Sequence, residues 1–256
     1  MNIIVSNDDG IFKEGIHVLV KALRSIPDAK LYVFAPDSER TAASMSLTTR
    51  EPIHIEEYDM PGADEAYSVS GTPVDCVRFG AYILRSRGIE PDLVCTGINH
   101  GANVGGDCYF SGTVGAATQG VMVDIPAIAF SICSHQPVSE HFELFYDLVP
   151  QVVNKAYGHI PKFTVVNVNV PNLPKEELKG IKVCRLGRHY YKEFYRDLGN
   201  GDYQLSLDTG NDFGPEHDPG MDTVAVLEKY VTIGPYSIRQ LKPGALEEIA
   251  SWNISL

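Results

Sequence analysis

Two adjacent carboxylates lie near the start of the chain, in the sequence Asn7-Asp8-Asp9-Gly10. They follow a short apolar run that is typical of a buried strand. Neighbouring carboxylates repel each other when both are ionised, so such a pair needs a counter-charge, and a divalent cation is the natural one. Taken alone, the four residues are more typical of a turn, because all of these residue types favour turns. Asp8 and Asp9 therefore indicate a metal site only if other ligands gather beside them.

Two further segments supply polar groups of a suitable kind. The segment 35–41 carries three of them, on Asp37, Arg40 and Thr41. A Gly-rich segment at residues 97–106 carries Asn99, whose amide oxygen suits a hard cation. Carboxylate, hydroxyl and amide oxygens favour magnesium or manganese, whereas zinc would be expected to draw Cys or His. A surface loop with a helix cap remains the simpler interpretation of segment 35–41 taken alone.

A helix start rich in small and hydroxyl-bearing residues comes next. Ser111, Gly112 and Thr113 precede a run of small residues, and this arrangement directs backbone amides, the helix dipole and two hydroxyls at one spot. Such a spot suits a phosphate, although an ordinary Ser/Thr cap has the same sequence. A metal facing a phosphate pocket is the arrangement of metal-assisted phosphoryl hydrolysis.

These loops can meet only if a suitable fold positions them. Strands alternating with crossover helices are expected along most of the chain, and they form a parallel sheet covered on both faces. The carboxyl ends of such strands share one edge, where ligands bind. Buried strands are predicted at residues 2–6, 31–35, 92–96, 127–131 and 163–168, an extended excursion near an edge at 48–58, and helices around 16–26, 73–84, 113–123 and 140–157.

The pattern changes after about residue 170. Residues 198–222 are rich in Gly and Asp, which predicts turns or a hairpin, and residues 224–233 are apolar and β-branched, which predicts a strand. We expect one α/β domain over residues 1–256, with a Rossmann-like, mostly parallel sheet and helices on both faces. Its core would cover about residues 1–185, and a C-terminal β-rich arm about 190–240.

The composition excludes several classes of protein. A hydrophobic content of 44% is ordinary for a globular chain, and 33 acidic against 21 basic residues give a net charge of −12. This charge disfavours a nucleic acid polymer as partner, because phosphate backbones need clustered Lys and Arg. The five cysteines are widely spaced and form no CxxC pair, which favours free thiols in a reducing compartment. With no signal peptide and no apolar run near the ~20 residues that span a bilayer, we expect a cytoplasmic protein without a membrane partner.

Several longer motifs keep a fixed order and spacing over about residues 1–135 and 219–236. They are IIVSNDDG from residue 3, FAPD from 34, ASMSLT from 43, GTPVDCV from 71, GINHGANVG from 97, YFSGTV from 109, MDTVAV from 221 and YVTIGP from 230. In these stretches the chain resembles the SurE family of survival-protein 5′-nucleotidases. Linked motifs in register are far more specific than any one of them alone.

The resemblance implies a phosphatase that hydrolyses nucleoside 5′-monophosphates with the help of a divalent metal, and that can also accept other phosphate esters or short polyphosphate. It implies one ion per subunit, Mg²⁺ or Mn²⁺, held by Asp8, Asp9, Thr41 and Asn99. Asp8, Asp9 and Asn99 would serve in catalysis. The phosphate would be bound by Asn103, Ser111, Gly112 and Thr113.

The resemblance also implies an oligomer and shows one departure. Members of the family form homodimers, often through an exchanged C-terminal β arm, and these can pair into homotetramers. The family usually has Ser-Gly where this chain has Thr41-Ala42. Thr41 keeps the hydroxyl, whereas Ala42 adds a Cβ atom that changes what the loop can adopt.

Three alternatives to a metal-assisted hydrolase remain open at the level of sequence. Asp8 could be a covalent nucleophile, although enzymes of that kind typically carry a second Asp two positions on, where this chain has Gly10. The chain could be a metal-dependent nucleotide-binding regulator without efficient turnover. It could also be a structural α/β protein whose turns only resemble a site.

Overall fold

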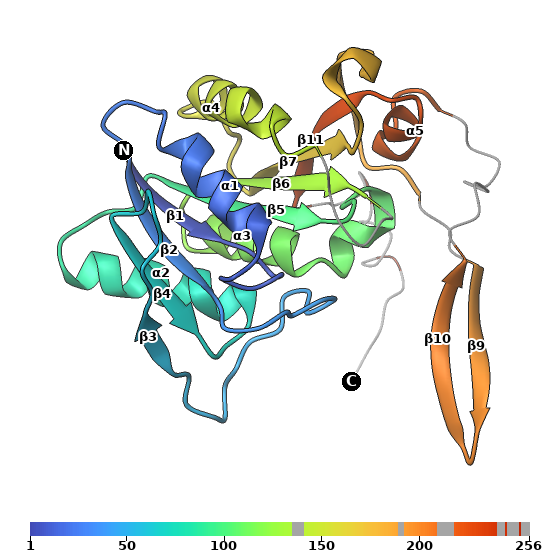
Figure 1. The fold of residues 1–256 in the computed structure, drawn as a ribbon, viewed down its shortest axis with the longest axis horizontal. Coiled ribbons are helices and arrows are strands. Elements are labelled where there is room, and N and C mark those ends of the chain that lie inside the picture. Colours follow the sequence, from blue (N-terminus) through green and yellow to red (C-terminus); the bar gives the residue numbers. More distant parts are fainter. Residues whose placement is uncertain (135–140, 189–191, 209–217, 240–243, 245–250, 252–256) are drawn as a thin grey trace.

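The computed structural model describes residues 1–256 apart from 135–140, 189–191, 209–217, 240–243, 245–250 and 252–256. A nine-stranded sheet forms the centre of the molecule (Figure 1). Its strands lie in the order β3 (Ile55–Glu57), β4 (Glu65–Val69), β2 (Lys30–Pro36), β1 (Asn2–Ser6), β5 (Leu93–His100), β6 (Ala127–Cys133), β7 (Thr164–Pro171), β11 (Val231–Ser237) and β8 (Ile181–Val183). Neighbouring strands are parallel except β3 with β4 and β7 with β11. The predicted mostly parallel α/β sheet is confirmed.

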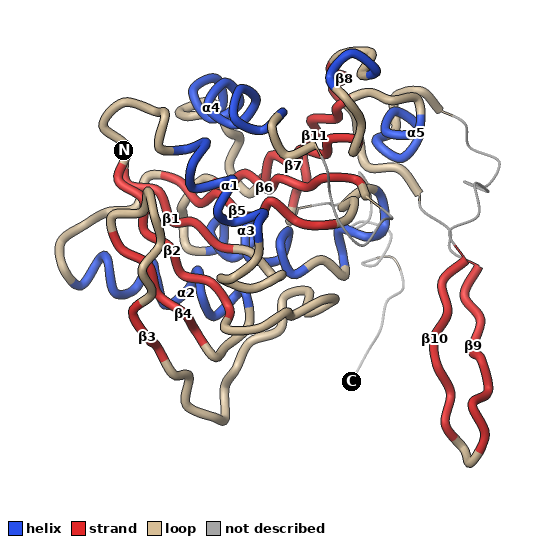
Figure 2. The backbone as a smooth tube through the Cα atoms, in the orientation of Figure 1, coloured by secondary structure: helices blue, strands red, loops and turns tan. Residues whose placement is uncertain are grey.

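Helices cover both faces of this sheet (Figure 2). One face packs against α1 (Glu14–Leu23) and α4 (Leu144–Ala156), and the other against α2 (Pro73–Ser86) and α3 (Gly112–Met122). Strand β1 serves both layers, because successive side chains of a strand point to opposite faces. Ile3 and Val5 join the core beneath α1 and α4, whereas Ile4 joins the core beneath α2 and α3. The four predicted helices of the core are thus present, with boundaries shifted by a few residues.

The order of the strands decides where a ligand can bind. The chain runs from β1 to β2 and β4 on one side, and then crosses to β5 on the other side of β1. The carboxyl ends of β1 and β5 therefore flank the point at which the winding reverses, where doubly wound sheets bind their ligands. Asp8 and Asp9 follow β1, and Asn99 lies near the end of β5, so all three belong to this place.

Part of the strand prediction was incomplete. Strand β4 lies inside the sheet but was not predicted, because its sequence, Glu-Ala-Tyr-Ser-Val, is short and has no continuous apolar run. Within the predicted excursion 48–58, only β3 is a strand, and it lies at the edge of the sheet as expected. Strand β5 continues to His100 instead of ending at residue 96, with an irregular register between Thr96 and Asn99. Asn99 is therefore held by a strand rather than by a loop.

The prediction of a strand over residues 224–233 was wrong in its first half. Helix α5 (Asp222–Leu227) occupies this part, and β11 begins only at Val231. The β-branched residues Thr223 and Val224 are buried on α5, so their packing overrides the weak helix propensity of such residues. Lys229 then takes a left-handed conformation, with φ +68°, and ends the helix before the strand.

A hairpin of β9 (Lys192–Gly199) and β10 (Asp202–Asp208) forms a separate two-stranded sheet and projects away from the central sheet (Figure 1). This agrees with the hairpin expected in the Gly- and Asp-rich region, although residues 209–217 lie outside the described part of the chain. Within the described ranges, no helix has both the length and the apolar character needed to cross a membrane.

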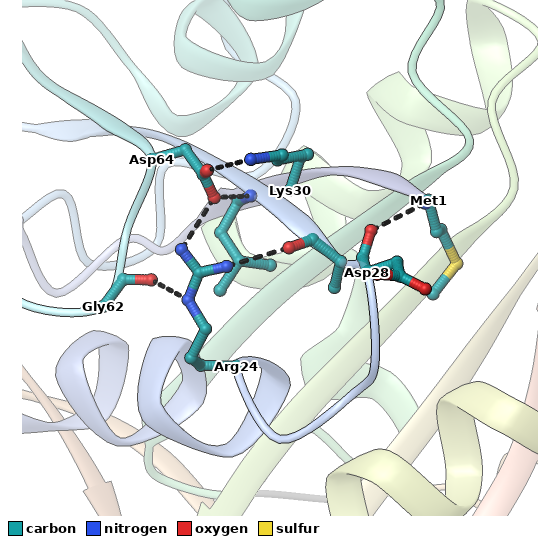
Figure 3. A network of polar contacts seen from close by, with 8 residues as sticks. Met1, Arg24, Asp28, Lys30, Gly62 and Asp64 are labelled. Atoms are coloured by element: carbon teal, nitrogen blue, oxygen red, sulfur yellow. Dashed lines mark hydrogen bonds and ion pairs between the residues drawn. The ribbon is translucent and has the colours of Figure 1, made fainter.

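A network of charges stabilises the amino end of β2, opposite to the end of the sheet where the candidate ligands lie (Figure 3). The Asp64 carboxylate accepts hydrogen bonds from the Leu31 backbone N–H at 3.0 Å, from the Arg24 guanidinium at 2.8 Å and from the Lys30 ammonium at 2.9 Å. Arg24 also donates to the carbonyl oxygens of Gly62 and Ala29. Burial alone would raise the pKa of Asp64, but these donors outweigh it and lower the pKa below its usual value.

We predict that Asp64→Asn lowers the free energy of unfolding at pH 7 by about 1 kcal/mol, because two partly exposed ion pairs are lost. A lowered pKa in the folded state stabilises the protein above the ordinary Asp value of 3.8, and this contribution is lost as the pH falls below it. The difference between wild type and variant should therefore shrink towards pH 3. Urea denaturation at several pH values measures it, with Asp59→Asn, an exposed position in the same connection, as control. A difference that does not change with pH would contradict this assignment.

Candidate metal and phosphate site

Asp8 is the most buried of the candidate ligands. It lies two positions after the end of β1 and is only 6% exposed, and its Oδ1 accepts a hydrogen bond from the Thr113 hydroxyl at 2.5 Å. Burial, together with the neighbouring Asp9 carboxylate, raises the pKa of Asp8 to about 6, although hydrogen bonds from Thr113 oppose the shift. In the metal-free protein, the surroundings of Asp8 therefore disfavour the charged form of its carboxyl.

Asp9 and Asn99 meet at the end of β5. The Oδ2 atom of Asp9 accepts a hydrogen bond from the His100 backbone N–H at 3.1 Å, which fixes Asp9 beside the residue that follows Asn99. Burial raises the pKa of Asp9, and the His100 bond partly opposes this. The Asn99 amide nitrogen donates to the Gly101 carbonyl at 2.8 Å. Its amide oxygen is therefore the atom of Asn99 that suits a cation.

The start of α3 lies directly against Asp8. Ser111 caps this helix, since its hydroxyl oxygen accepts the Val114 backbone N–H at 3.1 Å. Gly112 comes so close that a Cβ atom there would lie 2.8 Å from the Cβ and 2.9 Å from Oδ2 of Asp8. No side chain fits between the two, so glycine is required for the helix to reach the carboxylate. The structure therefore brings Asp8, Ser111, Gly112 and Thr113 together, as the sequence predicted.

The segment that carries Thr41 also reaches Asp8, but through its backbone. The Arg40 N–H donates to the Asp8 carbonyl at 2.7 Å. The Thr41 hydroxyl, which is exposed, donates to the Glu39 carboxylate at 2.6 Å. Ala42 has φ +57°, in the left-handed region that favours glycine, which gives a physical meaning to the departure noted in the sequence. Thr41 is thus next to the site, with its hydroxyl directed at Glu39.

Glu39 and Lys13 are charged neighbours of the site that the sequence analysis missed. Glu39 raises the pKa of Asp9 and Lys13 lowers it, although both effects are smaller than that of burial. The two side chains also form an exposed ion pair at 3.8 Å. The signal was weak, because a charged pair in surface loops is usually solvated.

Asn103 lies deeper than a residue at a ligand surface usually does. It is 4% exposed, and its side-chain amide donates to the Ser131 hydroxyl at 2.9 Å. Its backbone carbonyl accepts from the side-chain amides of Asn167 and Asn169 at 2.8 and 3.0 Å, and its N–H donates to Asn169 Oδ1 at 2.8 Å. The structure gives Asn103 an anchoring position in the loop. Two asparagines within the strand sequence Val-Asn-Val-Asn-Val were the signal that could have revealed these partners.

The donor set fits a hard divalent cation. A buried carboxylate, Asp8, and a half-buried one, Asp9, stand side by side with raised pKa values, and the amide oxygen of Asn99 adds a neutral ligand of the kind that Mg²⁺ and Mn²⁺ accept. A cation there would offset the burial and the nearby like charges that raise both pKa values. In the part of the chain that is described, no group of three or more His, Cys, Asp and Glu is arranged to hold a metal, which agrees with a set of only two carboxylates and neutral oxygens.

The fold and the site define a doubly wound α/β protein with paired carboxylates and a helix N-terminus at its switch point. Residues 3–193 match the family model described as survival protein SurE. A 5′-nucleotidase SurE from Pseudoalteromonas atlantica is 37% identical, with 98% of both chains covered, and one from Vibrio campbellii is 39% identical, with 98% of this chain and 94% of the relative covered. The crystal structure of the SurE protein from Aquifex aeolicus superimposes with a TM-score of 0.82 at 35% identity, covering 99% of this chain and 100% of that one. The chain belongs to the SurE family.

We predict that Asp8→Asn stabilises the metal-free protein above pH 6. A carboxyl whose folded pKa is raised from 3.8 to about 6 stabilises the fold below the lower value, and this contribution is lost as the pH rises to the upper one. The neutral amide avoids that loss, so the variant should gain about 3 kcal/mol at pH 8 and almost nothing at pH 3.5. Urea denaturation in EDTA measures the difference, with Asp28→Asn as an exposed control. A variant less stable than wild type at pH 8 would show that Asp8 is not held at an electrostatic disadvantage.

Proposed function

We propose that this protein is a divalent-metal-dependent phosphomonoesterase that hydrolyses nucleoside 5′-monophosphates to nucleoside and phosphate. The observation that supports it most directly is the position of one buried carboxylate, Asp8. It lies beside the carboxylate of Asp9 and also contacts Thr113 at the N-terminus of α3. Ligands for a cation and donors for a phosphate thereby share one place. The relatives named 5′-nucleotidase SurE support the choice of substrate. Other phosphate esters and short polyphosphate are further candidate substrates.

The metal would be held by Asp8, Asp9, Asn99 and Thr41, with Mg²⁺ or Mn²⁺ as the ion. When bound, such an ion supplies charge for the phosphate oxygens and lowers the pKa of water. Thr113 orients Asp8 by donating its hydroxyl proton to Oδ1. Thr41 joins the set if its hydroxyl oxygen, which now donates its proton to Glu39, turns a lone pair towards the cation.

The phosphate would be bound at the start of α3. The Ser111 hydroxyl accepts a hydrogen bond from Val114 and keeps its own proton, which it can donate to a phosphate oxygen. The amide of Gly112 belongs to the first turn, where backbone N–H groups have no partner within the helix. Asn103 would act by shaping the loop, since its side chain already donates to Ser131. Asp8 or Asp9 would accept the proton of the attacking water.

The arm and the thiols support two further parts of the proposal. Exposed apolar side chains on the hairpin of β9 and β10 favour a homodimer or homotetramer that covers them, and these are Tyr195, Leu198, Tyr203 and Leu205. The chain would form a single domain with this segment as its arm. All five cysteines are free thiols, which favours a reducing, cytoplasmic location.

A regulator that binds nucleotides without efficient turnover is the second candidate. It is favoured by one observation, the engagement of the Thr41 hydroxyl by Glu39 beside an alanine in a left-handed conformation. Such a protein would bind a nucleoside monophosphate tightly in the presence of metal and release no phosphate.

We predict that metal-stripped protein releases no phosphate from nucleoside 5′-monophosphates, and that added Mg²⁺ or Mn²⁺ restores release. Phosphate production from 5′- and 3′-monophosphates, first in EDTA and then with each metal, measures this directly. Asp8→Asn should lower the rate of phosphate release by at least about 10³-fold, because it removes a charged ligand, while leaving the circular dichroism spectrum unchanged. Wild-type rates in this variant, or release unaffected by EDTA, would refute the proposed chemistry.

We predict that Thr41→Ala raises the metal concentration needed for half-maximal activity by about 10-fold, the loss expected for one neutral ligand. Thr41→Ser keeps the hydroxyl and should stay within about 2-fold of wild type. The two variants are compared by titrating Mn²⁺ into metal-free protein. Equal metal affinity in all three proteins would mean that the Thr41 hydroxyl serves only Glu39.

A further inference from the structure

The chain leaves the core for the hairpin and returns to it through a narrow neck, made of residues 185–187 and 218–222. Arg185 exchanges two backbone hydrogen bonds there, since its N–H donates to Gly220 and its carbonyl accepts from Asp222, each at 3.0 Å. The Arg185 side chain also forms an ion pair with Asp218. The two passages of the chain are therefore fastened to each other where the arm begins.

Asp222 joins this neck to the Gly-rich loop of the candidate site. This residue is 4% exposed, and its Oδ1 accepts the backbone N–H groups of Gly187 at 2.7 Å and of Thr223 at 2.8 Å. The other oxygen, Oδ2, accepts the Gly105 N–H at 3.1 Å. Burial raises the pKa of Asp222, and these three bonds oppose the shift. One buried carboxylate thus binds the amide of its own neighbour, Thr223, and the amides of two segments that are distant in sequence.

The contact between the neck and the loop is tight. A Cβ atom on Gly105 would lie 2.9 Å from the Gly187 carbonyl oxygen and 2.9 Å from the Thr223 methyl group. Gly105 also has φ +52°, which a larger residue adopts only with strain. The loop therefore has little room to move relative to Asp222, and a change on one side is transmitted to the other by direct contact.

In the sequence, Gly105 lies midway between Asn99, a candidate metal ligand, and Ser111, a candidate phosphate ligand. On the side of Asn99, the chain is tied to β6 by the Gly101 N–H, which donates to the Ile132 carbonyl at 3.0 Å. On the side of α3, η1 (Gly105–Tyr109) starts at Gly105, and the Ser111 N–H donates to the Asp107 carbonyl at 3.0 Å. The hydrogen bond to Asp222 therefore fixes the first residue of η1. This short helix leads to Ser111, so its position sets where α3 begins.

We propose that Asp222 is a positioning residue, which couples the neck to the loop that runs from the end of β5, where Asn99 lies, to Ser111 at the start of α3. It touches neither the cation nor the phosphate, and acts by holding Gly105 against Gly187 and Thr223. This inference rests on the proposed function for the identity of the ligands. A residue about 120 positions further along the chain thus keeps Asn99 and Ser111 in fixed positions relative to each other.

The carboxylate is matched to this task by its number of acceptors. Three N–H donors converge on it, and a carboxylate offers acceptors on both oxygens. An asparagine offers one oxygen and one NH₂ group, so Asp222→Asn sets an N–H donor against at least one of the three amides. The side chain keeps its size, and the loss is confined to the hydrogen bonds that the proposal invokes.

Asp218 provides a matched control in the same neck. Its carboxylate pairs with Arg185 and accepts the Gly220 N–H at 2.8 Å, but it has no hydrogen bond to Gly105. Asp218→Asn therefore weakens the neck without releasing the loop. If Asp222 served only to hold the neck closed, the two variants would behave alike.

The test compares wild type, D222N and D218N as full-length chains. Mn²⁺ binding to the metal-free proteins is followed by electron paramagnetic resonance of the free ion, and KM and kcat for a nucleoside 5′-monophosphate are measured at saturating metal. We expect D222N to weaken Mn²⁺ binding and to raise KM, each by about 10-fold, with kcat changed by less than about 3-fold. D218N should stay within about 2-fold of wild type in all three quantities.

Several results would overturn the inference. One is a D222N protein with a lower Tm but unchanged Mn²⁺ binding and KM. Another is a D218N protein in which Mn²⁺ binding is weakened and KM is raised as much as in D222N. If D222N does not fold, Asp222→Ser, which brings no opposing NH₂ group, is measured in its place, and failure of both to fold would make Asp222 purely structural. A wild type that binds Mn²⁺ but releases no phosphate would refute the proposed function alone, because the Mn²⁺ comparison among the three chains would still test the positioning role.

Discussion

The burial of the Asp8 carboxylate at the start of α3 is the constraint on which the rest of the site depends. Gly112 has no room for a Cβ atom, and Thr113 must face Asp8 to donate its hydroxyl proton. Burial and the adjacent Asp9 together raise the pKa of Asp8 to about 6, so the metal-free protein holds this group at a cost in stability. A cation bound beside Asp8 would remove the disadvantage that the fold imposes on this carboxylate.

The two edges of the sheet divide the tasks of stability and chemistry. At the amino end of β2, Asp64 is surrounded by donors that lower its pKa, and its charge stabilises the fold. At the carboxyl ends of β1 and β5, two adjacent carboxylates are removed from water, and this burial raises their pKa values. An aspartate thus stabilises the fold at the amino ends of the strands and destabilises it at their carboxyl ends. The difference depends on the groups that the parallel topology places around each carboxylate.

The site is also supported from outside its own loops. Asn167 and Asn169 hold Asn103 from β7, while Asp222 holds Gly105 from α5. These supports use side chains that follow the ligand loop by more than 60 positions in sequence. Their polar atoms are buried, so each must be satisfied by a specific partner, and this makes the position of the loop well defined.

The sequence by itself determined the alternation of strands and helices, the edge at which Asp8, Asp9, Asn99 and Ser111 gather, and the family. Period, turn residues and motif spacing are local properties, and the rule that carboxyl ends of parallel strands share one edge adds the rest. Only the tertiary structure decided that Val224 and Ala225 belong to a helix, that β4 completes the sheet, and that the Thr41 hydroxyl faces Glu39. It also assigned Asn103 and Asp222 to anchoring positions. These outcomes depend on contacts between segments distant in sequence, whose packing and hydrogen bonds outweigh local preference.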